Sequence, residues 1–171
     1  MTNVRLPPVP GDRPLRVEFV CTGNICRSPM AEIVLREHAA RRGLADRIAI
    51  GSWGTGDWHV GQGADERTVA ALDRAGFDGT AHRARAIDGF AATEADLLVA
   101  LDRSHVAALR GLRPDAGERL VLLRAFDPEA DGDEDVPDPY WSGPDEFDRV
   151  LAMITRSVDG LLDALEPALR S

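Results

Sequence analysis

Residues 20–29 read Val20-Cys21-Thr22-Gly23-Asn24-Ile25-Cys26-Arg27-Ser28-Pro29. The apolar-rich, partly β-branched run over 15–20 that leads into this stretch predicts a strand, and Pro29 suits the first turn of a helix. A tight loop between a strand and a helix N-terminus binds anions, because the loop amides and the helix dipole both point at the bound group. The stretch therefore predicts an anion site that contains a thiol, Cys21, and a planar guanidinium, Arg27.

The apolar residues of the rest of the chain follow two patterns, one typical of strands and one typical of helices. Short apolar runs predict three further strands, at residues 47–50, 96–101 and 120–123. Longer segments with helical spacing of apolar residues predict helices at residues 28–42, 64–75, 104–112 and 144–165. This order predicts a single α/β domain, with a central four-stranded parallel sheet and helices on both faces. Ligands bind at the carboxyl ends of strands in such sheets, which is where Cys21 lies.

The composition of the chain fits one folded domain. It has 171 residues, of which 29% are charged and 44% hydrophobic. Residues 1–14 contain four prolines and predict a flexible N-terminal leader, followed by a domain at residues 15–167. The net charge of −9 argues against nucleic acid as a partner, and no apolar run is long enough to predict a membrane span. The two cysteines share one loop, which predicts reduced thiols and a cytoplasmic location rather than a disulfide framework.

The side chains of the 20–29 stretch suit the cleavage of a phosphate ester by a thiol. The loop amides, the helix N-terminus and Arg27 favour the thiolate form of Cys21. Arg27 can hold two phosphoryl oxygens, and the Ser28 hydroxyl can donate a hydrogen bond to the thiolate. Gly23 lets the backbone turn its amides inward, and Asn24 tolerates a left-handed conformation. We therefore predict a cysteine-dependent phosphatase whose phosphate-binding residues are Thr22, Gly23, Asn24, Ile25, Cys26 and Ser28.

The run from Val20 to Glu32, Val-Cys-Thr-Gly-Asn-Ile-Cys-Arg-Ser-Pro-Met-Ala-Glu, resembles the signature of the low molecular weight protein tyrosine phosphatases. The resemblance implies a single α/β domain whose general acid lies far downstream, in an Asp-Pro dipeptide followed by an aromatic residue. In this chain that acid is Asp138 of Asp138-Pro-Tyr140. Ser52 resembles the family residue that forms a hydrogen bond with Asn24 and supports the loop. The chain departs from the family pattern in its leader, at residue 53, and in the longer acidic stretch before Asp138.

A carboxylic acid is needed to protonate the leaving phenol and then to take a proton from water, and Asp138 suits both steps. Three aromatic residues, Trp58, Tyr140 and Trp141, are predicted to wall a deep slot. A phosphotyrosine would reach Cys21 through such a slot, whereas phosphoserine would be too short. The expected partners are phosphotyrosine-containing proteins, with tyrosine kinases among the candidates, and inorganic phosphate or other oxyanions in the loop.

Three other functions fit parts of the sequence. An arsenate reductase of the same architecture would need further redox cysteines downstream, and the chain has none beyond Cys26. A phosphoarginine phosphatase resembles this loop but carries Thr where this chain has Ile25, whose apolar side chain suits a flat aromatic ring. A catalytically silent phosphate-binding module would lack Cys21, Arg27 or Asp138, and all three are present. Cys26 is also a candidate to form a reversible disulfide with Cys21.

The sequence predicts no metal site and no cofactor. Acidic residues alternate between Asp127 and Asp138 in part of the calcium-loop pattern, but Pro128 and Pro137 interrupt it, so a solvated acidic loop fits better. The four histidines lack the spacing of metal ligands; they are His38, His59, His82 and His105.

Overall fold

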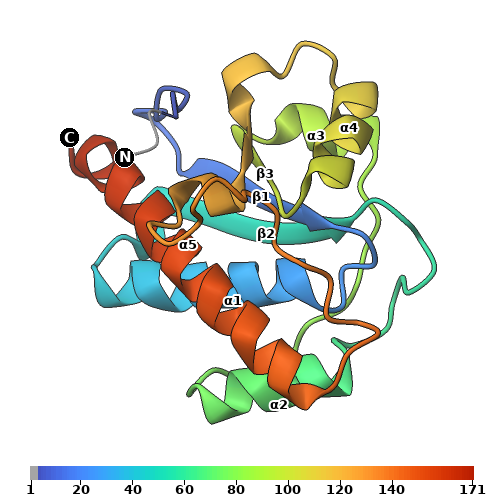
Figure 1. Ribbon diagram of the computed structural model, residues 1–171. Helices are drawn as coiled ribbons and strands as arrows, with labels where there is room; N and C mark the ends of the chain where they lie inside the picture. The colour runs from blue at the N-terminus through green and yellow to red at the C-terminus, as the bar shows by residue number, and fades with distance from the viewer. Residues whose placement is uncertain (1–3) are drawn as a thin grey trace.

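The computed structural model describes residues 4–171, which form a sheet between two layers of helices (Figure 1). All strand pairs are parallel, in the order β2-β1-β3-β4, and the strands are β1 (Leu15–Cys21), β2 (Ile48–Gly54), β3 (Leu97–Ala100) and β4 (Leu120–Leu122). The helices are α1 (Arg27–Arg41), α2 (Glu66–Arg74), α3 (Gly89–Glu94), α4 (Arg103–Leu112) and α5 (Pro144–Arg170). Figure 1 shows α1 and α5 on one face and α3 and α4 on the other. The predicted fold class is confirmed.

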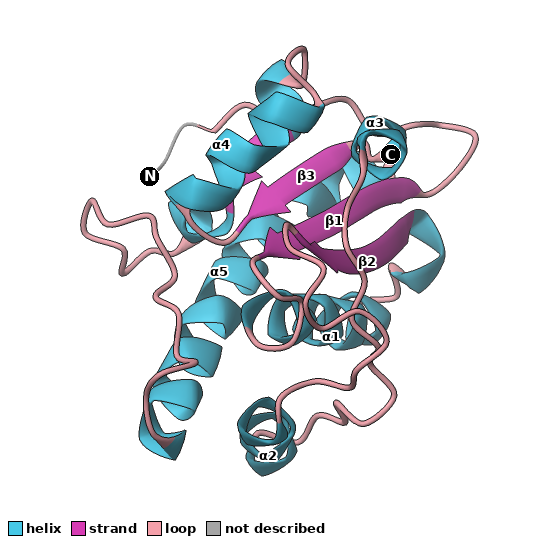
Figure 2. Ribbon diagram, turned by 90° about the vertical axis from the view of Figure 1, so that its right-hand side faces the viewer, coloured by secondary structure: helices cyan, strands magenta, loops and turns pink. Residues whose placement is uncertain are grey.

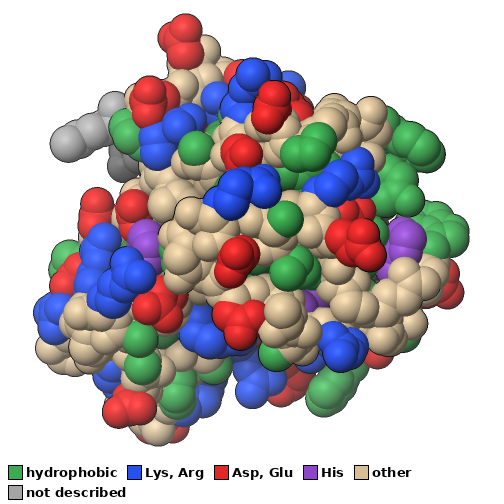
Figure 3. All heavy atoms as spheres, turned by 90° about the horizontal axis from the view of Figure 1, so that it is seen from below, with side chains coloured by type: hydrophobic (Ala, Val, Ile, Leu, Met, Phe, Trp, Pro, Cys, Tyr) green, Lys and Arg blue, Asp and Glu red, His purple; other side chains and the backbone are tan. Residues whose placement is uncertain are grey.

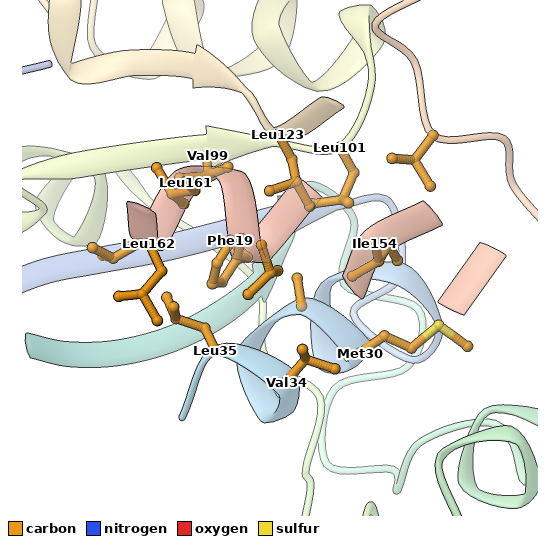
Figure 4. Packing of buried hydrophobic residues seen from close by; sticks show 14 of the residues in the cluster. Phe19, Met30, Val34, Leu35, Val99, Leu101, Leu123, Ile154, Leu161 and Leu162 are labelled. Atoms are coloured by element: carbon orange, nitrogen blue, oxygen red, sulfur yellow. The ribbon is translucent and has the colours of Figure 1, made fainter. Parts of the chain in front are cut away.

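The central strand β1 is buried on both faces, and its successive side chains enter two different cores. Phe19 packs into the main core together with Leu35 of α1 and Leu161 of α5 (Figure 4). Val20, the next residue, packs into the smaller core with Leu109 of α4. Since successive side chains of a strand point to opposite faces, the adjacent apolar residues Phe19 and Val20 indicate a segment covered on both faces, whereas Arg16 and Glu18 interrupt the apolar run nearer the start of the strand.

The strand order places the anion loop at a reversal in the direction of winding. From β1 the chain crosses to β2 on one side, then returns past β1 to β3 on the other. Such a reversal opens a crevice at the carboxyl ends of the two strands where the direction changes, here β1 and β3. Figure 2 shows the loops that gather over this edge of the sheet.

Three elements differ from the sequence-based prediction. Strand β2 continues to Gly54, which pairs with Cys21, so Ser52 lies within a strand that was predicted to end at residue 50. Helix α3 was not predicted, because six residues are too few to show helical periodicity. Helix α5 continues past the predicted end at 165 because Leu169 is buried and anchors the last turn.

The predicted leader, residues 1–14, lies partly outside the described residues, since residues 1–3 are not described. Val4, Leu6 and Val9 pack against the main core. Arg13 binds the Asp96 carboxylate through two hydrogen bonds of 2.6 and 2.9 Å. These contacts attach residues 4–14 to the rest of the chain, while the domain boundaries at 15 and 167 and the flexibility of the leader stay predictions.

Acidic and basic side chains are interspersed over the face shown in Figure 3, and hydrophobic side chains gather at its right-hand edge. Among residues 4–171, no helix combines the length and the apolar character that crossing a bilayer requires.

Candidate active site

The loop between β1 and α1 begins at Cys21, the last residue of the strand, and ends at Arg27, the first residue of the helix. Asn24 has a φ of 57°, the left-handed conformation expected for it. Gly23 is not in that conformation; a Cβ atom there would lie 2.9 Å from the His59 ring. A side chain at residue 23 would therefore force the His59 ring to move, while the inward turn of the loop amides at Gly23 stays a prediction. The first turn of α1 contains no acidic side chain, so its positive end is left for an anion.

Buried hydroxyl and amide groups support the loop from behind. Ser28 Oγ lies 2.9 Å from Cys21 Sγ, and the side-chain amide of Asn24 donates to Ser28 Oγ at 2.8 Å and to Ser52 Oγ at 2.9 Å. Ser52 in turn donates to Glu32 at 2.6 Å. The interaction of Ser52 with Asn24 that the resemblance implied is thus present. Asn24 and Ser28 hold the loop in shape and are absent from the lining of the pocket that it forms.

The Arg27 side chain is buried and its orientation is fixed by two partners. Its Nη1 donates to Asp102 Oδ2 at 2.7 Å and to the carbonyl of Val136 at 2.9 Å. Its Nη2 lies 3.4 Å from Thr22 Oγ1 and 3.6 Å from Asp138 Oδ2. With Nη1 satisfied by the protein, Nη2 is the end of the guanidinium that faces the loop and Asp138.

Asp102 follows β3 and caps the N-terminus of α4, accepting from the backbone amides of Ser104 and His105. Burial raises the pKa of Asp102, but hydrogen bonds from the Ser104 side chain and from Arg27 outweigh this and lower it to about 2. Asp102 is therefore ionised at neutral pH and is a permanent counter-charge for Arg27. Its position at the carboxyl end of β3 is the one that the winding reversal brings beside the end of β1.

The loop forms the floor of a pocket of about 190 Å³. The pocket is lined by Cys21, Thr22, Gly23, Ile25, Cys26, Arg27, Trp58, His59, Asp138, Tyr140 and Trp141. The structure thus brings Cys21, Arg27 and Asp138 together from distant parts of the chain. The Asp138 side chain is half-exposed, and its Oδ1 accepts from the backbone amide of Tyr140 at 3.1 Å.

The three predicted aromatic residues all lie at the rim of this pocket. Trp58 and Trp141 are 70% and 90% exposed, and Tyr140 is partly buried. The Tyr140 and Trp141 rings meet edge to face with centroids 4.8 Å apart, and the His59 ring lies 6.4 Å from that of Tyr140. These rings give the entrance a mainly aromatic wall, with Ile25 as an apolar contact from the loop.

Cys26, which shares the loop with Cys21, is buried, and its surroundings disfavour the negatively charged thiolate. Burial raises the pKa of its thiol to about 12, so it is a neutral thiol at physiological pH. Both cysteines are free thiols. The reversible disulfide between them stays a prediction.

Residues from outside the predicted site also contact the loop or the strands beside it. His82 Nε2 lies 2.7 Å from the Asn24 carbonyl, and the Arg85 backbone amide donates to Asn24 Oδ1 at 3.0 Å. The Arg85 guanidinium stacks on the Trp53 ring, with its Cζ 3.6 Å from the ring centroid. Trp53 Nε1 donates to the buried Glu18 at 2.9 Å. These groups come from separate segments of the chain, which the tertiary fold brings together around the loop.

The family model described as "low molecular weight phosphotyrosine protein phosphatase" matches residues 16–170. A protein of Streptomyces coelicolor named low molecular weight protein-tyrosine-phosphatase is 48% identical over 153 residues, which cover 88% of this chain and 93% of that protein. The crystal structure of YfkJ from Bacillus subtilis superposes with a TM-score of 0.85 at 32% identity, covering 92% of this chain and 98% of YfkJ. The structure of the Escherichia coli K30 tyrosine phosphatase Wzb in complex with sulphate matches with a TM-score of 0.76 at 27% identity, covering 88% of this chain and 97% of Wzb.

These matches agree with the α/β fold described above. The chain belongs to the low molecular weight protein tyrosine phosphatase family, and it is a hydrolase.

Proposed function

We propose that this chain hydrolyses phosphotyrosine in proteins through a phosphocysteine intermediate on Cys21. The observation that carries the proposal is the meeting of Cys21, Arg27 and Asp138 in one pocket with aromatic walls. The three groups supply what the reaction needs: a nucleophile, a fixed positive charge for the phosphoryl oxygens, and a proton donor.

In the first step the Cys21 thiolate attacks phosphorus from the floor of the pocket. The bond between phosphorus and the phenolic oxygen breaks, and the phenolic oxygen takes the proton of the Asp138 carboxyl group. Arg27 holds the equatorial oxygens through Nη2 and Nε while Nη1 stays bound to Asp102 and Val136. The loop amides and the unopposed positive end of α1 stabilise the charge on the same oxygens.

In the second step water attacks the phosphocysteine and gives a proton to the Asp138 carboxylate. The phosphorus–sulfur bond breaks, which releases inorganic phosphate and restores the Cys21 thiolate. Ser28 Oγ lies 2.9 Å from Cys21 Sγ, so its hydroxyl group can stabilise the departing thiolate. Asp138 returns to its acid form and the cycle closes without a cofactor.

The pocket walls favour a phenyl phosphate over the alternatives. The rings of Trp58 and Tyr140, with the apolar side chain of Ile25, offer contact to a flat aromatic group. The guanidinium group of a phosphoarginine needs hydrogen-bond acceptors. Ile25 has no hydroxyl group to accept from it, so this position does not favour phosphoarginine. The structure of the related Wzb in complex with sulphate supports oxyanion binding by this chain, inorganic phosphate included.

The partners that follow from this chemistry are phosphotyrosine-containing proteins, and a tyrosine kinase phosphorylated on its own tyrosine would be one such substrate. Two free thiols, one of which must stay reduced to react, support a reducing location such as the cytoplasm.

Turnover of matched phosphotyrosine, phosphoserine and phosphoarginine peptides tests the proposal. We expect wild type to act on phosphotyrosine at least a hundredfold faster than on the other two, and Cys21→Ser to be inactive on all three. Acid quenching during turnover should trap a phosphoryl group on Cys21, detected by mass spectrometry. Absence of phosphotyrosine turnover by wild type would refute the proposal. A preference for the phosphoarginine peptide would show that the substrate is phosphoarginine and not phosphotyrosine.

The acid role of Asp138 needs its own comparison. Asp138→Asn should slow the hydrolysis of a phenyl phosphate about a hundredfold, and that of an ester with a strongly acidic phenol much less, because the latter leaves without a proton. Glu134→Gln is the matched control, since Glu134 belongs to the same acidic stretch and is absent from the pocket lining. Equal losses of Asp138→Asn on both esters would remove Asp138 from the acid role.

A further inference from the structure

A buried histidine, His105, lies directly behind the phosphate loop. It occupies the third position of α4, with a side chain only 2% exposed. Its Nε2 lies 2.9 Å from Thr22 Oγ1, and its Nδ1 lies 3.1 Å from the backbone nitrogen of Asp102. His105 therefore contacts both the loop that carries Cys21 and the residue that holds Arg27.

The two contacts determine which ring nitrogen carries the proton. The Asp102 backbone N–H donates to Nδ1, so Nδ1 is the acceptor nitrogen. In the neutral ring the proton is then on Nε2, which makes Nε2 a donor to Thr22 Oγ1. The opposite tautomer would set an Nδ1–H group against the Asp102 N–H. Asp102 Oδ1 also lies 3.3 Å from Nδ1, but it already accepts from the Ser104 hydroxyl and from the backbone amides of Ser104 and His105. Burial, followed by the charge of Arg27, lowers the pKa of His105 to about 4, which keeps the ring neutral at physiological pH.

The donor from His105 constrains the hydroxyl group of Thr22. Thr22 Oγ1 faces two donors, His105 Nε2 at 2.9 Å and Arg27 Nη2 at 3.4 Å. A hydroxyl group accepts two hydrogen bonds and donates one. Its own proton finds no acceptor among the described residues 4–171, and Thr22 lines the pocket. An oxygen of a bound phosphoryl group is the acceptor that would complete this set.

We propose that His105 is a positioning residue of this site: it donates from Nε2 to Thr22, so that the Thr22 hydroxyl proton is presented to the bound oxyanion. Through the Asp102 cap, the same ring also fixes the carboxylate that orients Arg27. Only the expected effect of His105 on turnover rests on the proposed function. Its effect on oxyanion binding can be measured without any reaction.

The two contacts of His105 can be separated by substitution. An asparagine amide matches the position of Nδ1, so His105→Asn keeps an acceptor for the Asp102 N–H and loses the donor to Thr22. A glutamine amide reaches the position of Nε2, so His105→Gln restores that donor. Thr22→Val removes the hydroxyl group at nearly constant volume. The readouts are the dissociation constant of inorganic phosphate by calorimetry, kcat and KM on a phosphotyrosine peptide, and the melting temperature.

We expect His105→Asn and Thr22→Val each to weaken phosphate binding about fivefold and to lower kcat more than they change KM, as loss of one hydrogen bond to an anion would do. The double variant should lose no more than either single variant, because both remove the same interaction. His105→Gln should bind phosphate within about twofold of wild type.

Phosphate binding by His105→Asn at the wild-type level would overturn the proposal. So would a double variant whose loss is the product of the two single losses. A His105→Gln variant as impaired as His105→Asn, with melting temperatures lowered in parallel, would show a purely structural role and would overturn it too. An absence of phosphotyrosine turnover in wild type would refute the proposed function, while the phosphate data would still test His105.

Discussion

Asn24 Nδ2 donates to Ser52 Oγ at 2.9 Å and thereby ties the anion loop to strand β2. Asn24 is fully buried, and its φ of 57° is a backbone conformation that most side chains disfavour. Its side chain also donates to Ser28 and accepts from the backbone amide of Arg85. One residue thus provides both the turn of the loop and its attachment to the sheet.

Two substitutions of Asn24 separate these contributions. Asn24→Gly keeps the left-handed conformation and loses the hydrogen bonds, whereas Asn24→Ala loses both. We expect both variants to lose at least tenfold in phosphotyrosine turnover, with Asn24→Ala about 1 kcal/mol less stable than Asn24→Gly. Urea unfolding followed by tryptophan fluorescence measures the difference. If the alanine variant were as stable as the glycine variant, the left-handed conformation would contribute nothing.

The local part of this site could be predicted from the sequence, and its surroundings could not. Cys21 and Arg27 belong to one strand–loop–helix unit, whose geometry depends on neighbouring residues. Asp138 was found only through its resemblance to a family motif, since an aspartate in an acidic stretch has no distinguishing pattern. His105 and Asp102 were missed as site residues because parallel pairing of β1 with β3 brings them to the loop.

The fold follows the same division between local and distant information. The apolar runs predicted all four strands, because every strand carries apolar side chains that pack into one of the two cores. The extension of β2 to Gly54 has no such signal, since its residues are glycine, serine and tryptophan. It depends on the register with β1, in which Cys21 pairs with Gly54. That register is also what places Ser52 within reach of Asn24.

Asp102 predicts a pH-dependent contribution to stability. Its pKa in the folded chain is about 2, below the ordinary value of 3.8, so the stabilisation is complete above 3.8 and is lost as the pH falls toward 2. Asp102→Asn should therefore cost about 1–2 kcal/mol at pH 7, after allowance for solvent screening, and much less at pH 2.5. The measurement is urea unfolding of both proteins across this pH range.

Exposed Asp115 is the control for Asp102, and Asp115→Asn should change the free energy of unfolding by less than about 0.5 kcal/mol. A constant gap between wild type and Asp102→Asn from pH 7 to 2.5 would mean that the charge of Asp102 contributes nothing.

Gly54 lies so close to the anion loop that a side chain there would displace the loop backbone. A Cβ atom at residue 54 would lie 2.7 Å from the Thr22 carbonyl oxygen and 3.1 Å from the Gly23 carbonyl carbon. Gly54→Ala should destabilise the fold by about 1–3 kcal/mol and weaken the binding of inorganic phosphate, because backbone atoms cannot rotate away. Calorimetry with phosphate and thermal unfolding test both effects.

Gly111 is the matched control for Gly54, since it lies within α4 and nothing surrounds its Cβ position within 4 Å. Gly111→Ala should stabilise the chain by about 0.5–1 kcal/mol through helix propensity and leave phosphate binding unchanged. A Gly54→Ala variant that bound phosphate as tightly as wild type would contradict the steric argument.

Cys26 should resist alkylation in the folded chain. Burial raises the pKa of its thiol to about 12, so only about one part in ten thousand is thiolate at pH 8, and the thiolate is the form that reacts. Iodoacetamide should therefore label the folded Cys21→Ser variant only slowly and should label it fully at Cys26 after unfolding in urea. Mass spectrometry of the peptide that spans residues 17–27 gives the extent of labelling. Rapid labelling of Cys26 in the folded variant would contradict the burial of its thiol.

The neutral Cys26 thiol also determines how a disulfide with Cys21 would form. Peroxide would first oxidise Cys21 to a sulfenic acid. Cys26 would then lose its proton and attack the sulfenic sulfur as a thiolate, expelling hydroxide, which becomes water with the proton that Cys26 released. Because that thiolate is scarce at pH 7, we expect the Cys21–Cys26 disulfide to form faster as the pH rises from 7 to 9, with overoxidation of Cys21 to sulfinic acid competing at the lower pH. Quantifying both products by mass spectrometry after peroxide treatment measures the competition. A disulfide yield independent of pH would show that the Cys26 proton is lost by some route other than bulk titration.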